Sequence, residues 1–170
     1  NSNTSLKKTI LEIREILGGT PLTETEQFLN TIRQISPGKT HTFKRKVRVE
    51  NSALMTEYQI GQRSPKLLAQ LMLIENLLKP HFYNELRTKQ QLGYIVDSSI
   101  SVLEKTLGLI LLIQSGEYNP KTLNKSIHTF IENFNLSLRN LSDFEINKIK
   151  KSILNRKLQK TNSMRNEAVR

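Results

Sequence analysis

Cysteine is absent from the 170-residue sequence. A disulfide framework, thiol catalysis and thiolate coordination of a metal are therefore excluded for these residues. The absence does not identify a compartment, because a chain without cysteine tolerates both oxidising and reducing surroundings. Cytoplasm and periplasm both stay open.

Long apolar runs are also missing. The two longest, Leu67–Ile74 and Leu107–Ile113, are much shorter than the roughly 20 residues that cross a bilayer, so we expect no membrane span. Lys7, Lys8 and Glu12 interrupt the first residues, which therefore lack the apolar core of a signal peptide. The sequence begins with Asn rather than Met, and we interpret it as a piece of a longer protein.

Positive charge dominates: 26 Lys and Arg against 15 Asp and Glu give a net charge of +11. This balance favours nucleic acid, an anionic membrane or an acidic protein as a partner. Only 6% of the residues are aromatic, too few for the stacking surface of a single-strand binder. A solvated helix face or a lysine-guarded edge strand explains the charge equally well. The densest groups are Lys44, Arg45, Lys46 and Arg48, and then Lys148, Lys150, Lys151, Arg156, Lys157 and Lys160.

Apolar spacing and capping signals predict the helices. One covers Leu6–Leu17, and a second begins at Thr23 and ends at Pro37-Gly38. Ser64-Pro65 starts a third, which we expect to stop near Pro80, with a shorter helical stretch over His81–Gln90. Asn119-Pro120 starts another, and Ser142 with Glu145 forms a capping box for a last basic helix to about Lys160.

Alternating apolar and polar residues predict the strands. These are Thr40–Val49, Ala53–Gln62, Tyr94–Val102 and Leu107–Gln114, the last expected to be central and buried on both faces. Two strands, helices, two strands and two helices indicate an α+β fold, an antiparallel sheet with helices packed on one face. The short connector Leu103–Thr106 favours an antiparallel pair.

The chain has little that could hold a metal or a phosphate. His41, His81 and His128 are scattered, and although His81 and Glu85 share a helix face, no third ligand is near. We therefore expect no metal site in this chain. A phosphate-binding loop and a serine nucleophile elbow are also missing.

One segment, LRTKQQLGY from Leu86 to Tyr94, combines groups suited to a peptide carbonyl. The pattern predicts a helix end, a tight turn at Gly93 and a strand that begins with Tyr94. Arg87 offers a planar cation and Tyr94 a neutral donor, which suit a developing oxyanion. From spacing alone, the simpler reading is that Arg87 pairs with Glu85 and Tyr94 packs partly in the core.

The stretch FYNELRTKQQLGYIV, Phe82–Val96, resembles the signature of the carboxy-terminal domain of the pitrilysin/insulin-degrading-enzyme (M16) family of zinc metallopeptidases. Arg87, Gln91, Leu92, Gly93 and Tyr94 match without departure. A looser resemblance extends over residues 40–170, including LILLIQSGEYNP and LSDFEINKIKKSILNRKL. It implies a partial copy, truncated at its end, of the M16/LuxS-like α+β domain. Residues 1–39 resemble a helical lead-in, the tail of the preceding domain.

The resemblance also implies a function. The parent would be a zinc metalloendopeptidase that degrades peptides, with zinc bound outside this chain by an HxxEH motif and a distant Glu of the amino-terminal half. Tyr94 and Arg87 would contact the substrate carbonyl, acting neither as base nor as nucleophile. Peptides and the amino-terminal half would be the partners, and this fragment alone would be inactive.

Two alternatives stay open. A non-catalytic partner subunit with the same fold would bind peptides without zinc. A basic nucleic-acid-binding module is supported by charge alone, so nucleic acid is the less favoured partner. Substrate identity, oligomeric state (a homodimer included), the parent's length and its retention of HxxEH are not determined by these residues.

Overall fold

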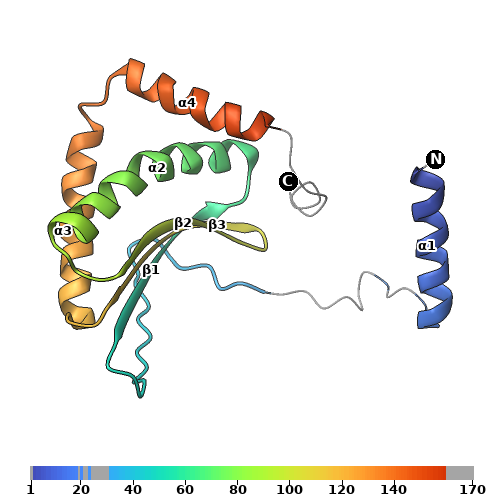
Figure 1. Ribbon diagram of the computed structural model, residues 1–170, viewed down its shortest axis with the longest axis horizontal. Coiled ribbons are helices and arrows are strands. Elements are labelled where there is room, and N and C mark those ends of the chain that lie inside the picture. Colours follow the sequence, from blue (N-terminus) through green and yellow to red (C-terminus); the bar gives the residue numbers. More distant parts are fainter. Residues whose placement is uncertain (1, 19, 21–22, 24–30, 160–170) are drawn as a thin grey trace. The chain divides into compact units, whose positions relative to one another are not determined.

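The computed structural model describes residues 2–18, 20, 23 and 31–159 (Figure 1). The chain divides into two units, Asn1–Ile32 and Arg33–Arg170. The first contains α1, Ser2–Leu17, which confirms the predicted helix over Leu6–Leu17 and extends it toward the N-terminus. Within the described residues, no helix is long and apolar enough to cross a membrane.

The second predicted helix lies partly outside the described residues, which omit 24–30. Residues 31–36 are described and are not helical, so this part of the prediction is wrong. The Ile35 N–H bonds the Gln59 Oε1 at 2.8 Å, and Gln59 Nε2 donates to the Arg33 carbonyl at 3.3 Å. The backbone groups of Arg33 and Ile35 therefore bond to the Gln59 side chain instead of forming helical hydrogen bonds.

Among the described residues, three antiparallel strands form one sheet in the order β1-β3-β2. Their bounds are Ser52–Gln62 for β1, Ile95–Leu103 for β2 and Thr106–Ser115 for β3. The predicted antiparallel pair and the central position of β3 are confirmed. At the β2–β3 turn Glu104 adopts a φ of 48°, in the left-handed region that tight hairpins require.

The prediction of a strand over Thr40–Val49 is wrong. Residues 40–47 have no regular structure, and bends at 48–50 lead into β1. The alternation alone was insufficient, because a strand is stable only where another strand bonds to its backbone.

Two long helices pack against the sheet, and both follow their predicted caps. The first, α2, covers Pro65–Tyr83, and the Ser64 side chain accepts from the Leu67 N–H at 3.1 Å. It continues past Pro80 instead of stopping there, and becomes a π-helix, η1, over Asn84–Lys89. The second, α3, covers Pro120–Leu138 with Asn119 as its cap.

The last helix, α4, covers Asp143–Leu158 and begins with the predicted capping box of Ser142 and Glu145. Glu145 has a lowered pKa because it accepts hydrogen bonds from the backbone N–H and then the hydroxyl of Ser142. Arg156 donates to the Asn76 side chain at 3.0 Å, which joins α4 to α2.

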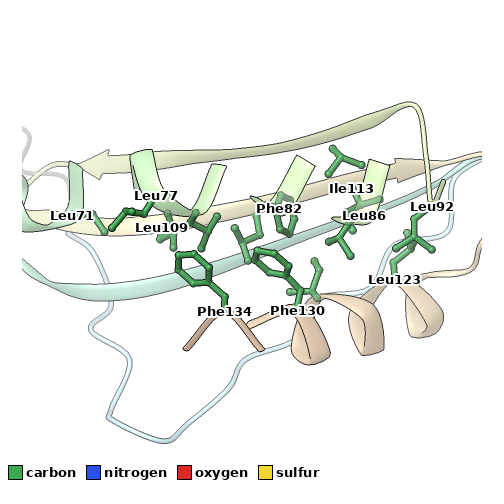
Figure 2. Close-up of a cluster of buried hydrophobic side chains, with 14 of the residues drawn as sticks. Leu71, Leu77, Phe82, Leu86, Leu92, Leu109, Ile113, Leu123, Phe130 and Phe134 are labelled. Carbon is green, nitrogen blue, oxygen red and sulfur yellow. The ribbon is translucent and has the colours of Figure 1, made fainter. Parts of the chain in front are cut away.

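The core lies between one face of the sheet and the helices (Figure 2). Phe82 and Phe130 meet edge to face at its centre, with ring centroids 5.2 Å apart. Fully buried members include Leu78, Phe82, Leu86, Leu107, Leu111, Ile113, Leu123 and Ile127. Helices on one face of an antiparallel sheet confirm the predicted fold class.

Burial of β3 on both faces is a second part of the sheet prediction that is wrong. Leu111 and Ile113 face the helices and are fully buried. Ile110 and Leu112, on the opposite face, are half-buried, because no described helix covers that side. Among the described residues, the sheet therefore has one covered and one open face.

Candidate functional site

The segment that carries Arg87 and Tyr94 begins with the π-helix η1. π-helical turns are rare in proteins overall, but those that do occur are often found at functional sites. Leu86, within η1, is fully buried and packs in the core. The segment therefore enters the turn from a fixed position.

Three backbone hydrogen bonds hold the turn that follows. The Gln90 N–H donates to the Glu85 carbonyl at 3.0 Å, and the Leu92 N–H donates to the Leu86 carbonyl at 2.9 Å. The Tyr94 N–H donates to the Gln114 carbonyl of β3 at 3.1 Å. Leu92 is itself buried, so the turn is anchored on both sides.

Gly93 lies against the backbone of β3. A Cβ built at this position would overlap the Gln114 carbonyl group, so only glycine fits without movement of the chain. Gln91, two residues earlier, has a φ of 52°, which costs a non-glycine residue of the order of 1–2 kcal/mol. A strained residue held by its surroundings is common at sites that position a side chain.

Tyr94 lies directly before β2 rather than being its first residue, which corrects the predicted strand start by one position. Its side chain is 52% exposed, and the Arg87 side chain is half-buried. Neither the Tyr94 hydroxyl nor the Arg87 guanidinium has a hydrogen bond or ion pair within the described part of the chain. The turn thus carries Tyr94 to the start of β2 while Arg87 stays in η1, and neither side chain's polar group has a partner among the described residues.

The simpler reading predicted that Arg87 pairs with Glu85. In the structure Glu85 has other partners. Its carboxylate is 2.9 Å from Lys89 Nζ and accepts from Gln90 Nε2 at 3.1 Å. These bonds, the one with Lys89 first, hold the Glu85 pKa below its ordinary value. Lys89 balances the charge of Glu85, Gln90 adds a hydrogen bond, and the Arg87 cation has no carboxylate partner among the described residues.

A zinc ion needs three or four ligand side chains that come together at one point. Within the described ranges, no three His, Cys, Asp or Glu side chains come together in a way that could hold a metal. The one pair considered from the sequence has other contacts: the His81 ring lies 6.2 Å from the Phe134 ring, and Glu85 bonds Lys89 and Gln90.

Sequence reasoning did not find the surface groove beside this segment. The groove has a volume of about 320 Å³ and lies between α3 and the end of α2 with η1. Its walls come from residues some 40 positions apart, so no local pattern could reveal it. Lys89 and Gln90 border it on the same stretch that carries Arg87.

Residues 73–170 match the family model described as PQQ synthase PqqF-like, C-terminal lobe domain 4. The A-factor-processing enzyme of Saccharomyces cerevisiae is 34% identical over 120 residues, which are 71% of this chain and 12% of that protein. Insulin-degrading enzyme-like 2 of Arabidopsis thaliana is 25% identical over 87% of this chain and 16% of its own length.

A solved structure agrees. The crystal structure of pitrilysin matches with a TM-score of 0.62 and 25% identity, over 72% of this chain and 13% of that one. Fold and sequence together define the class as that of zinc metallopeptidase domains. The chain belongs to the M16 family, that of pitrilysin and insulin-degrading enzyme, and corresponds to its carboxy-terminal domain. It spans less than a fifth of the length of these relatives.

Proposed function

We propose that this chain is the carboxy-terminal part of a zinc metalloendopeptidase, in which it supplies substrate contacts to a catalytic centre elsewhere in the protein. Membership of the M16 family supports peptide hydrolysis by the parent. The zinc ion would be held outside this chain, by the amino-terminal half. By this proposal the chain alone neither binds zinc tightly nor cleaves peptides.

The observation that carries the proposal is the pair of unused donors at a rigid turn. A peptide carbonyl gains negative charge on its oxygen as its carbon becomes tetrahedral. A phenol and a guanidinium that are held in place before the reaction stabilise that charge without reorganisation. Tyr94 and Arg87 have such groups, unpaired in the described structure, on a segment fixed by Leu86, Leu92 and Gly93.

Steady-state kinetics of Tyr94→Phe in the full-length protein test this role. We expect kcat to fall about 10²–10³-fold, the usual effect of removing one such donor, while zinc content and melting temperature stay unchanged. Tyr83→Phe is the matched control, because Tyr83 is also 52% exposed but lies at the end of α2. Arg87→Ala should lower kcat/KM, and KM would rise if the guanidinium also holds the ground-state peptide.

Wild-type kcat in a folded, zinc-replete Tyr94→Phe protein would remove the catalytic role. A full-length protein with no peptidase activity, in which both variants weaken peptide binding, would instead identify a non-catalytic partner subunit. Oligonucleotide binding that falls steeply with salt would favour the basic nucleic-acid module over both.

A further inference from the structure

The turn between η1 and β2 contains one residue whose backbone conformation its own side chain does not hold. Gln91 has a φ of 52°, in the left-handed region that non-glycine residues rarely adopt. Its side chain is exposed and has no hydrogen bond within the described residues. The conformation is therefore imposed by the residues on either side of Gln91.

The two neighbours of Gln91 are held by different means. Leu92, which follows it, is buried, and its N–H donates to the Leu86 carbonyl at 2.9 Å. Gln90, which precedes it, is half-buried and is not a member of the hydrophobic core. Packing fixes the backbone at Leu92, whereas the backbone at Gln90 depends on polar contacts.

Gln90 makes two hydrogen bonds to Glu85. Its backbone N–H donates to the Glu85 carbonyl at 3.0 Å, and its Nε2 donates to the Glu85 Oε1 at 3.1 Å. The other carboxylate oxygen, Oε2, lies 2.9 Å from Lys89 Nζ, so Lys89 balances the charge and leaves Oε1 to Gln90. A hydrogen bond to an ionised carboxylate is roughly twice as strong as one between neutral groups. The side-chain bond therefore strengthens the closure that the backbone bond begins.

This closure lies four residues before Tyr94. Gln90 is the last residue at which η1 is bonded to the chain before it, and Gln91 then reverses the direction of the backbone. A change of φ or ψ at Gln90 or Gln91 would alter the path by which the chain reaches Tyr94. The bonds between Glu85 and Gln90 oppose such a change.

We infer that Glu85 and Gln90 are positioning residues for Tyr94. This role rests on the proposed function, in which the Tyr94 hydroxyl stabilises the developing charge. A donor that is fixed in advance is effective only while it stays where that charge develops. The Glu85–Gln90 pair keeps Gln91 in its left-handed conformation and so limits the movement of Tyr94.

Steady-state kinetics of Gln90→Ala in the full-length protein test this role. We expect kcat to fall about three- to tenfold, the range that corresponds to the loss of one hydrogen bond, with a much smaller change in KM. Hydrogen exchange of the Tyr94 amide should become faster. Thr88→Ala, at an exposed position of η1, is the matched control and should leave both measurements unchanged.

Exchanging the two partners tests the pair directly. Gln90→Glu alone brings two carboxylates together and should lower kcat at least as far as Gln90→Ala does. Adding Glu85→Gln reverses the hydrogen bond, because the new amide donates to the new carboxylate. The double variant should therefore recover a kcat within about twofold of the wild type.

Combination with Tyr94→Phe separates positioning from a general loss of stability. If Gln90 acts through the Tyr94 hydroxyl, Gln90→Ala should lower kcat less in the Tyr94→Phe background than in the wild type. Equal factors in both backgrounds would overturn the inference, as would wild-type kcat in Gln90→Ala or no recovery in the exchanged pair. Wild-type kcat in Tyr94→Phe alone would instead overturn the proposed function, so the two failures are distinguishable.

Discussion

Two segments of this chain have strong strand-like patterns, and the structure treats them in opposite ways. Tyr94 leads into β2, and β2 pairs with β3 along its length. Residues 40–47 alternate as clearly but are irregular and exposed. The difference lies in the anchors rather than in propensity, because Leu86, Leu92 and Gly93 deliver the first segment to a neighbouring strand.

This comparison indicates where the free energy that fixes the candidate site comes from. The side chains of Arg87 and Tyr94 make no polar contacts that would hold them in the described structure. Their positions depend instead on two buried leucines and on the close approach of Gly93 to β3. Replacing Leu86, Leu92 or Gly93 should therefore make the segment Tyr94–Val102 less ordered, as residues 40–47 are.

Loss of the Leu86 anchor should have the largest effect on stability. Leu86 is fully buried, and Leu86→Ala should lower the free energy of unfolding by about 2–5 kcal/mol through lost transfer energy and the cavity left behind. Thr88→Ala, at an exposed position of the same π-helix, is the control and should change stability by less than about 0.5 kcal/mol. Urea denaturation measures both, and a Leu86 effect as small as the control's would show that the anchor is not needed.

Gly93→Ala should have the next largest effect. The added methyl group meets the Gln114 backbone, which cannot move as a flexible side chain can. We expect a loss of about 1–3 kcal/mol, typical of overpacking, together with faster hydrogen exchange of the Tyr94 amide. Unchanged exchange at that amide would mean that the turn accepts a side chain and does not require glycine.

The sequence predicts those elements whose signals are local. Ser64, Asn119 and Ser142 mark helix starts, and each caps its helix in the structure. The continuous apolar run at Leu107–Gln114 identified the central strand. In these cases a few neighbouring residues determine the conformation, so pattern reasoning is sufficient.

Prediction from the sequence failed where packing against residues distant in the sequence determines the conformation. Pro80 predicted a helix end, but packing of Phe82 and Leu86 in the core keeps the chain helical beyond it. For the candidate site, the sequence indicated Arg87, Gly93 and Tyr94. It carried no signal for the π-helix or for the left-handed Gln91, because both depend on how Leu86 and Leu92 are buried.

The smallest predicted effect concerns pH and separates the charge of Glu85 from the anchoring by leucines. The pKa of Glu85 is lowered in the folded chain, chiefly by its bond to Lys89 and then by Gln90. A carboxylate with a lowered pKa stabilises the fold above its unfolded pKa, near 4.5, and this contribution is lost as the pH falls through the folded value. Glu85→Gln should therefore flatten the decline in stability below about pH 4.5, and only slightly, since the pair is largely exposed and screened.

Lys89→Met should flatten the same part of the curve, because it removes the main cause of the lowered pKa. Melting temperatures from pH 3 to 7 measure this, and a Lys89→Met profile that parallels the wild type throughout would show that the ion pair contributes nothing to the stability of the turn.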